Sequence, residues 1–227
     1  MANGSVLFVH GSFFSGWCWM PVIQHLSERH LNCRTVELPF TSLHDDAEHL
    51  RREISRAAHD GPVTVVAHSY TGITLSLAGH EAQHLVHVAA RMPALGESQA
   101  ALNATWGNPD FRKCMTVDES GWMRLTDDAH EFLFHRSDAN LARVAMAYRR
   151  PMRSEIPVEP IDSPAWLSVP SSYLVCSDDH AVNVEQQRTR AGWAKHSIEI
   201  DCDHSPFFSA PRETAAFIAD THEAATQ

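Results

Sequence analysis

The stretch VVAHSYTG, residues 65–72, places a serine between a run of valines and a small-residue segment of helical character. A strand that ends at His68 and a helix that begins near Tyr70 would hold Ser69 on a sharp turn, with its hydroxyl above the sheet and the helix N-terminus beneath it. That geometry suits a serine nucleophile. The same residues also suit a serine that caps a helix, so the stretch alone leaves both interpretations open.

Two later segments supply the partners that a serine nucleophile needs. CSDDHAV (176–182) and DCDHSPF (201–207) each follow a strand-like segment, and α/β proteins place working groups at the carboxyl ends of parallel strands. Only one of the adjacent residues Asp178 and Asp179 can be buried and aimed at His204. The chain order Ser, Asp, His, with each group just beyond a strand, favours a catalytic triad over three unrelated residues.

The loop VHGSFFSGWCW (9–19) offers backbone donors and aromatic rings. Its glycine permits a tight turn, so the N–H of Ser12 and the N–H of Tyr70 are the candidate donors to a developing oxyanion. Four large rings in the loop exceed what a connector needs, although a loop that only covers the sheet edge is the alternative. We expect an apolar substrate pocket with contributions from Phe13, Phe14, Trp106, Trp122 and Phe134.

The elements that must position these groups follow from the hydrophobic pattern. Strand-like apolar segments alternate with segments of helical spacing, which predicts βαβ units and a parallel sheet. Residues 92–168 lack the strand signal and carry aromatic-rich helical patches, so they are expected to form a helical cap inserted in a core of residues 1–91 and 169–227. The expected strands are 5–10, 33–39, 62–68, 84–90, 171–177 and 197–201, and the expected core helices are 20–30, 42–61, 71–80, 183–194 and 212–225.

Composition excludes several classes of function. The net charge of −10, with basic residues surrounded by carboxylates, argues against nucleic acid as a partner. No segment is apolar for long enough to cross a bilayer, and the N-terminus lacks the basic leader of a secretory signal. Five widely spaced cysteines without a C-x-x-C pair indicate a cytoplasmic protein with reduced thiols. The segments DDH and DCDH contain metal-ligand types, but no H-x-x-x-H or C-x-x-C pair accompanies them, so we expect no metal.

Over nearly its whole length the chain resembles the α/β-hydrolase fold, and more closely the small bacterial and plant esterases grouped with methyl-ester hydrolases and hydroxynitrile lyases. The resemblance implies a mostly parallel sheet of about six strands flanked by helices, with a helical cap. It favours Asp179 over Asp178 as the acid. The matching segments are HG....GWCW (10–19), AHSYTG (67–72), HVAARMPALGES (87–98), YLVCSDDHAV (173–182) and DHSPFFSAP (203–211).

The resemblance also implies a serine hydrolase that cleaves a carboxylic ester or lactone of a small to medium apolar or aromatic substrate through an acyl-enzyme. Ser69 would attack the carbonyl, His204 would transfer the proton and Asp179 would orient the imidazole. The backbone N–H groups of Ser12 and Tyr70 would stabilise the oxyanion. A small molecule is then the expected partner, no cofactor is required, and a homodimer formed through the cap is left open.

Three residues bear on the alternatives. Thr71 stands where the family usually has glycine, and it adds bulk beside the nucleophile. The hydroxyl of Ser12 lies where the lyases of this group use a hydroxyl to bind a cyanohydrin, but Ser205 replaces the lysine that those lyases characteristically carry after the histidine. A serine esterase or lactonase is therefore preferred. The alternatives are a carbon–carbon lyase on the same scaffold and a non-catalytic ligand-binding member of the fold.

Overall fold

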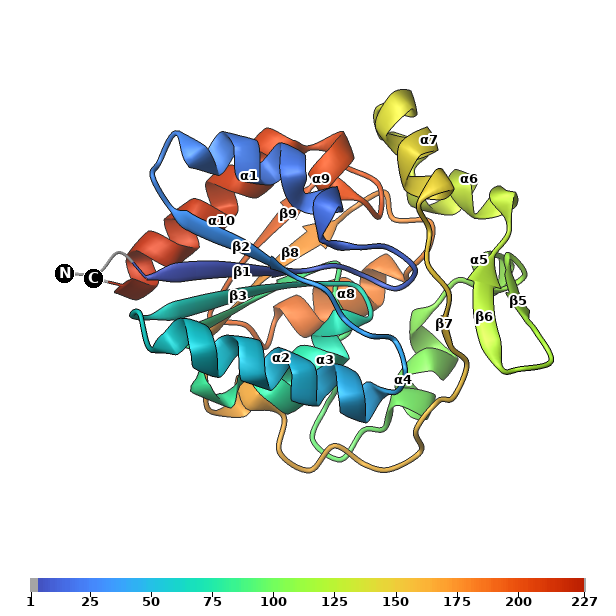
Figure 1. The fold of residues 1–227 in the computed structure, drawn as a ribbon, viewed down its shortest axis with the longest axis horizontal. Helices are drawn as coiled ribbons and strands as arrows, with labels where there is room; N and C mark the ends of the chain where they lie inside the picture. The colour runs from blue at the N-terminus through green and yellow to red at the C-terminus, as the bar shows by residue number, and fades with distance from the viewer. Residues whose placement is uncertain (1–3, 227) are drawn as a thin grey trace.

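The computed structural model describes residues 4–226 and is built around a six-stranded sheet (Figure 1). All six strands run parallel, in the order β2-β1-β3-β4-β8-β9, which confirms the expected sheet. The strands are β1 (Ser5–Val9), β2 (Asn32–Val36), β3 (Val63–His68), β4 (His84–Val88), β8 (Ser171–Cys176) and β9 (His196–Ile200).

The place of each strand in the sheet explains its hydrophobic pattern. The four central strands are buried at every residue, as a near-continuous apolar run such as VTVVAH requires when helices cover both faces. The edge strands β2 and β9 keep most of their residues partly or fully exposed. From β1 the chain moves outward to β2 and then crosses to β3 on the other side of β1. The carboxyl ends of β1 and β3 therefore flank a topological switch point, where open α/β sheets bind ligands.

Helices cover both faces of this sheet (Figure 1). α1 packs with α10 on one face, and α2 packs with α3 on the other, where α8 also lies. The start of α2 is capped by Ser42, whose Oγ accepts the N–H of Asp45 at 3.0 Å. The core helices are α1 (Met20–Ser27), α2 (Leu43–Ala58), α3 (Thr71–Ala78), α8 (Val184–Ala191), α9 (Pro206–Ser209) and α10 (Pro211–Thr226), with 3-10 turns at Gly16–Trp19, Gly79–Glu81 and Ala165–Leu167.

The insertion between β4 and β8 contains strands as well as the expected helices. Its helices are α4 (Gln99–Trp106), α5 (Pro109–Arg112), α6 (His130–Leu133) and α7 (Ala139–Ala147), with a 3-10 turn at Asp127–Ala129. A three-stranded antiparallel sheet joins them, with β6 (Trp122–Leu125) between β5 (Met115–Val117) and β7 (Met152–Arg153). The division of the chain at residues 92 and 168 stays a prediction.

The strands of the insertion are too short to be predicted from the hydrophobic pattern of the sequence. Each has two to four residues, too few for the alternation that marks a strand. The turn from β5 to β6 depends on Asp118, whose Oδ1 accepts the N–H groups of Ser120 and Trp122 at 3.0 Å each. Gly121 completes it at φ +79°, a left-handed conformation that glycine adopts without strain.

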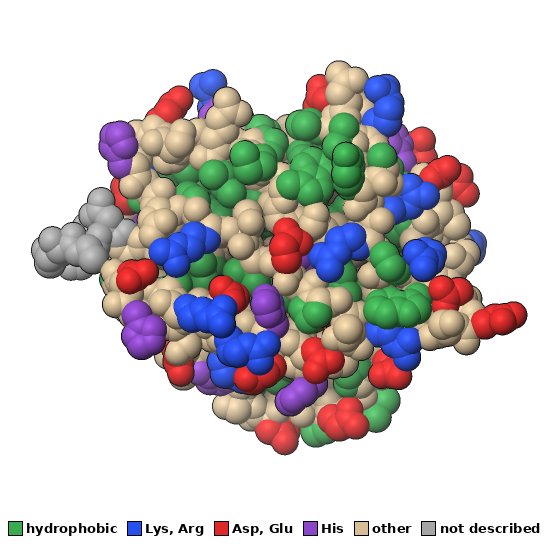
Figure 2. Space-filling view, in the orientation of Figure 1, with side chains coloured by type: hydrophobic (Ala, Val, Ile, Leu, Met, Phe, Trp, Pro, Cys, Tyr) green, Lys and Arg blue, Asp and Glu red, His purple; other side chains and the backbone are tan. Residues whose placement is uncertain are grey.

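The surface drawn in Figure 2 mixes acidic and basic side chains, and hydrophobic side chains gather at its upper edge between α1 and α7. None of the helices within residues 4–226 is both long and apolar enough to cross a membrane.

Two histidines of β4 are buried in the core. His84 is hydrogen-bonded through Nε2 to the Ser172 hydroxyl at 2.9 Å. His87 stacks on Tyr173, with 6.0 Å between ring centroids, and neither of its ring nitrogens has a partner within the described residues. Burial lowers the pKa of His84 to about 4 and the pKa of His87 to about 3. Both rings are therefore neutral near pH 7.

This burial predicts that stability falls in mild acid. The folded-state pKa of His87 lies below the ordinary value of about 6.5, so the unfolded state binds the extra proton between these two values. Each such histidine lowers the free energy of unfolding by about 1.4 kcal/mol per pH unit as the pH falls through that window. We expect His87→Phe, which keeps a ring against Tyr173, to remove one such contribution. Urea unfolding at successive pH values measures the slope.

The exposed His59 offers the matched control. His59→Phe should leave the slope of stability against pH as it is in the parent protein. A slope equally steep in His87→Phe and in the parent would contradict the prediction.

Candidate active site

Ser69 lies on the turn between β3 and α3 in a left-handed conformation, with φ +55°. Its N–H donates to the Val88 carbonyl at 3.2 Å, and its own carbonyl accepts the N–H groups of Gly72 at 3.2 Å and Arg91 at 2.9 Å. A non-glycine residue in this region carries on the order of 1 kcal/mol or more of strain, which the surrounding bonds must hold. The turn thus places the serine at the carboxyl end of the sheet, where a nucleophile elbow is expected.

The residues that follow Ser69 let this turn pack tightly. A Cβ on Gly72 would lie 2.4 Å from the Arg91 carbonyl oxygen, so only glycine fits there. Thr71 is fully buried, and its Oγ1 donates to the His68 carbonyl at 2.8 Å. The threonine hydroxyl therefore provides a hydrogen-bond donor for the last carbonyl of β3. Thr71 does not line the cavities described below, so its bulk does not narrow them.

An unbroken hydrogen-bonded line joins the three residues that the sequence predicts as a triad. The Nε2 atom of His204 lies 3.0 Å from Ser69 Oγ, and its Nδ1 lies 2.6 Å from Asp179 Oδ2. All three side chains are buried. The geometry lets the imidazole take a proton from the serine while the carboxylate accepts the Nδ1–H.

Further donors orient the Asp179 carboxylate. Oδ1 accepts the N–H groups of Ala181 at 2.9 Å and Val182 at 2.8 Å, and Oδ2 also accepts the side-chain amide of Gln187 at 2.8 Å. Gln187 is itself fixed, because its Oε1 accepts the N–H of Cys176 at 3.0 Å. The carboxylate is therefore held toward His204 from several sides.

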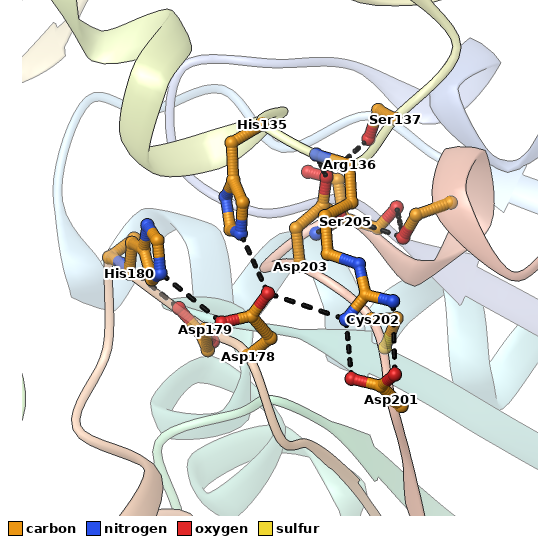
Figure 3. A network of polar contacts seen from close by, with 12 residues as sticks. His135, Arg136, Ser137, Asp178, Asp179, His180, Asp201, Cys202, Asp203 and Ser205 are labelled. Atoms are coloured by element: carbon orange, nitrogen blue, oxygen red, sulfur yellow. Dashed lines mark hydrogen bonds and ion pairs between the residues drawn. The ribbon is translucent and has the colours of Figure 1, made fainter.

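The neighbouring Asp178 turns the other way, into the polar network of Figure 3. Its Oδ2 accepts from His135 Nε2 at 3.2 Å and from Arg136 at 3.3 Å, and its Oδ1 lies 3.2 Å from His180 Nε2. Partial burial opposes ionisation, but the hydrogen bond from His135 and the charges of His135, His180 and Arg136 together lower the pKa of Asp178. Of the two adjacent acids, Asp178 thus links the core to the insertion.

The loop that carries His204 is tied to the insertion by Asp203, which is fully buried. Its Oδ1 accepts the N–H of Ser205 at 3.0 Å and the hydroxyl of Ser209 at 2.8 Å. Its Oδ2 accepts the N–H of Arg136 at 2.9 Å and the hydroxyl of Ser137 at 2.8 Å (Figure 3). One carboxylate therefore holds the histidine loop and the segment after α6 together.

His68 supports the same loop from the sheet side. Its Nε2 donates to the His204 carbonyl at 2.8 Å, and the centroids of the two rings lie 4.7 Å apart. Burial lowers the pKa of His68 well below its usual value. The ring is therefore a neutral donor that positions the His204 backbone.

The predicted oxyanion donors lie on the two loops that flank Ser69. Within residues 4–226 neither the N–H of Ser12 nor the N–H of Tyr70 has a hydrogen-bond partner, so both are available to a ligand. His10 holds the first loop: its Nε2 accepts the N–H of Leu38 at 3.1 Å and its Nδ1 donates to the Gly11 carbonyl at 3.0 Å. Burial lowers the pKa of His10 to about 4, which keeps the ring in the neutral form that this arrangement requires.

The sequence suggests that glycine is needed at position 11 for a tight turn, but the structure shows another cause. The φ of Gly11 is not in the left-handed region. A Cβ at this position would lie 2.6 Å from His68 Nδ1 and 3.3 Å from Ser69 Cβ. Gly11 is required because the loop and the elbow approach each other closely.

Two adjoining cavities open beside these groups. The nucleophile cavity, of about 30 Å³, is lined by Ser69, His68 and His204 together with residues from the first loop and the insertion. The arginine cavity, of about 170 Å³, lies beyond Tyr70 and is lined by residues of α2, α4 and the small sheet. The two cavities share Ser12, Phe13, Arg91, Phe111 and Met115.

Two of the five predicted pocket aromatics line these cavities. Phe13 borders both, and Phe14 borders the nucleophile cavity. Phe134 does not reach the wall and packs edge-on against Phe14, with 5.4 Å between ring centroids. It therefore supports a pocket residue from behind.

Trp106 and Trp122 also lie away from the cavity walls. Trp106 is fully buried in the core, with the Arg190 guanidinium 5.9 Å from its ring. Trp122 lies on β6, with the Arg153 guanidinium 5.4 Å from its ring. An aromatic ring in the insertion can either pack in the core or line a pocket, and the sequence pattern is the same in both cases.

The sequence interpretation missed Arg91, Gln187 and Asp203. Arg91 lies three residues after the end of β4, within the apolar segment VAARMP, and this place beyond the carboxyl end of a strand was a usable signal. Asp203 stands beside His204, but nothing in the sequence shows that it faces the insertion. Gln187 carries no signal, because one polar residue in a polar helix has no distinguishing neighbour.

One group of metal-ligand types comes together in the part of the chain that the structure describes. Ligand atoms of His135, Asp178 and His180 lie within 4.8 Å of one another, and the two imidazole rings stack 3.8 Å apart. The Arg136 guanidinium donates to the same Asp178 oxygen as His135. This positive charge lies beside the carboxylate and would repel a cation bound there, so the group suits a link between insertion and core better than a metal site.

Comparison with known proteins places this arrangement among hydrolases. A profile of the Alpha/beta hydrolase family matches residues 6–217. The chain is 27% identical to methylesterase 7 of Arabidopsis thaliana, over 94% of both chains, and 25% identical to a probable hydrolase of a Phoma species, over 97% of this chain and 98% of that one.

Solved structures share the fold. A methylesterase from Arabidopsis superposes with a TM-score of 0.79 at 18% identity, covering 97% of this chain and 99% of that chain. A pyrethroid hydrolase from Sphingobium faniae superposes with a TM-score of 0.81 at 17% identity, covering 97% and 98%.

The Asp203 contacts predict a stability effect. Asp203→Asn would turn an amide N–H₂ toward hydrogen-bond donors in a buried site, so we expect the free energy of unfolding to fall by about 2–4 kcal/mol. The matched control is Asp201→Asn, because Asp201 is an exposed carboxylate that pairs with Arg136 at the surface. That change should cost less than about 1 kcal/mol. Urea unfolding measures both, and equal losses would contradict the role of Asp203.

Proposed function

Since the chain belongs to the alpha/beta hydrolase family, we propose that it cleaves carboxylic esters or lactones of small to medium apolar or aromatic substrates with Ser69 as the nucleophile. The observation that carries the proposal is the line from Ser69 Oγ through His204 to Asp179, with bonds of 3.0 and 2.6 Å. Its relatives named methylesterase and hydrolase support the same reaction.

Acylation begins when Ser69 Oγ attacks the carbonyl carbon and its proton passes to His204 Nε2. Asp179 stabilises the imidazolium through Nδ1–H. The negative charge that develops on the carbonyl oxygen is bound by the N–H groups of Ser12 and Tyr70, and each such donor contributes on the order of 3 kcal/mol in the transition state. Collapse of the tetrahedral intermediate breaks the carbon–oxygen bond of the ester, and the leaving alkoxide takes the proton from His204.

Deacylation repeats these steps with water. The water oxygen attacks the acyl carbon and gives one proton to His204 Nε2, and the second tetrahedral intermediate collapses to release the carboxylic acid. Ser69 Oγ recovers its proton from His204. The neutral rings of His10 and His68 position the oxyanion loop and the His204 loop, and they exchange no proton with the substrate in this scheme.

The cavities set the size and polarity of the substrate. The small nucleophile cavity has aromatic walls from Phe13, Phe14 and Phe111, with Leu133 and Val182 beside them. The adjoining arginine cavity has room for a few further heavy atoms. Ser205, which lines the nucleophile cavity, brings no charged group to the reacting atoms, and this favours hydrolysis over the lyase alternative.

A small-molecule ester or lactone is thus the proposed partner, and a cytoplasmic location is proposed from the thiols. The residues Cys18, Cys33, Cys114, Cys176 and Cys202 are all free in the structure, and four of them are buried. Free thiols of this number suit a reducing compartment.

The nucleophile is tested by Ser69→Ala. We expect kcat/KM for p-nitrophenyl acetate and butyrate to fall by about 10³-fold or more, with loss of fluorophosphonate labelling, because within residues 4–226 Ser69 carries the one hydroxyl that is hydrogen-bonded to His204 Nε2. Ser76→Ala is the matched control, since Ser76 is a buried serine of α3 whose hydroxyl donates to the Gly72 carbonyl away from both cavities. Parental turnover by Ser69→Ala would rule out this nucleophile.

The lyase alternative has its own test in the parent protein. We expect turnover of the p-nitrophenyl esters and no release of cyanide from mandelonitrile above the background rate, because Ser205 stands where the lyases of this group carry a lysine after the histidine. Cyanide release that requires Ser69, without ester turnover, would replace the hydrolase by a lyase. Labelling of Ser69 without either reaction would support the nucleophile and contradict only the proposed class of substrate. Absence of both labelling and turnover would favour a ligand-binding protein.

A further inference from the structure

Arg91 is a cation beside the nucleophile that the proposed chemistry does not use. It lines both cavities, and its backbone N–H is bound to the Ser69 carbonyl. Its Nε is buried with no hydrogen-bond partner, and its guanidinium forms no ion pair within residues 4–226. Burial lowers the pKa of Arg91 to about 10; the nearby Tyr70 phenol opposes this shift, and the charge of Arg112 adds a smaller one in the same direction as burial. Arg91 is half-buried, and a guanidinium partly removed from water without a partner is costly unless a ligand supplies the missing charge.

The other charged groups of the arginine cavity do not neutralise Arg91. Asp46 uses both carboxylate oxygens elsewhere: Oδ1 accepts the N–H of Phe40 and Oδ2 accepts the Tyr70 hydroxyl, each at 2.8 Å. At another part of the wall Arg153 and Glu155 pair with each other at 3.6 Å. Within residues 4–226, neither Arg91 nor Arg112, the two other cations of this wall, has a carboxylate partner, and Arg91 is the one that also lines the nucleophile cavity.

Polar groups and apolar walls complete this cavity. Arg112 donates to the backbone carbonyls of Asn103 and Gly107. The side-chain oxygens of Gln99 and Asn103 are buried without partners, so each amide can turn to present either its N–H₂ or its oxygen to a ligand. Most of the remaining wall is aliphatic or aromatic, formed by Phe13, Phe40, Leu43, Phe111, Met115, Met123, Met152 and Ile156.

The position of His204 indicates which part of an ester enters the arginine cavity. The leaving alcohol must depart next to His204 Nε2, which gives it the proton, and His204 lines only the nucleophile cavity. The arginine cavity instead begins at Ser12 and Tyr70, whose N–H groups would bind the carbonyl oxygen. The acyl chain then extends from the carbonyl carbon past Tyr70 toward Arg91.

We propose, on the basis of the hydrolase function above, that the acyl chain is apolar along its length but ends in a carboxylate that Arg91 binds, so that the substrates are monoesters of short dicarboxylic acids. The planar guanidinium matches a carboxylate with two parallel hydrogen bonds. The apolar wall accepts the methylene or aromatic spacer between the two carboxyl carbons. Arg91 is thus the specificity-determining residue of the acyl side.

The first experiment compares substrates on the parent protein. We expect kcat/KM for monomethyl glutarate to exceed that for dimethyl glutarate, its neutral counterpart of equal chain length, by about 100-fold, mainly through KM. Free glutarate should inhibit competitively. Comparing kcat/KM for monomethyl succinate, glutarate and adipate identifies the spacer length that fits the cavity. Equal rates on the monoester and the diester across this series would overturn the inference while leaving the hydrolase function intact, whereas failure to hydrolyse any ester would overturn both.

The second experiment tests Arg91 itself. Arg91→Met should reduce the preference for the monoester over the diester to less than about threefold and abolish inhibition by glutarate, and Arg91→Lys should retain part of both because it keeps the charge without the planar fork. The matched control is Arg188→Met, because Arg188 lies on α8 and pairs with Glu185 and Glu199 at the surface. Its preference should equal that of the parent protein. Retention of the full preference in Arg91→Met would place the carboxylate site elsewhere.

The last arm distinguishes the two sides of the ester. In 3-acetoxypropanoate the carboxylate belongs to the alcohol, so the parent protein should show no preference for it over its methyl ester. An Arg91-dependent preference for 3-acetoxypropanoate, in place of monomethyl glutarate, would overturn the assignment to the acyl side. Labelling of Ser69 by a fluorophosphonate in each variant shows that the fold and nucleophile are intact.

Discussion

The left-handed turn at Ser69 is the constraint on which the site depends. A serine holds this conformation only because neighbouring strands supply the bonds: β4 gives the Val88 carbonyl, and the segment after it gives the Arg91 N–H. The turn also needs space, which two glycines provide by lacking a Cβ where His68 and the Arg91 backbone pass. Strand order, loop geometry and residue size thus combine to lift one hydroxyl out of the sheet.

The core and the hydrogen-bonded line from Ser69 through His204 to Asp179 could be predicted from the sequence because their signals are local. A strand buried on both faces must be a continuous apolar run, and a working side chain just beyond it is visible as a polar interruption, as at Ser69 and His204. The six strands are therefore where the pattern places them. Between Asp178 and Asp179 the residues alone could not decide, since both follow the same strand and only their three-dimensional partners differ.

What could not be predicted depends on contacts between distant segments. The strands of the insertion are too short to show a period, and Trp106 has the same pattern whether it faces a pocket or the core. Gln187 and Asp203 are defined by what they bind, namely Asp179 in one case and the segment 136–137 in the other. Arg91 becomes meaningful only when the absence of a carboxylate partner within the described residues is known.

The backbone and the side chain of Arg91 have separate tasks. Its N–H is bonded to the Ser69 carbonyl, whereas its guanidinium lies against the cavities. Any residue except proline can provide that N–H, so a single codon change at position 91 would alter the charge of the cavity wall and keep the bond that holds the elbow. Substrate specificity in such a protein can therefore evolve by single substitutions at position 91. The same position is the natural choice for a saturation library in protein engineering.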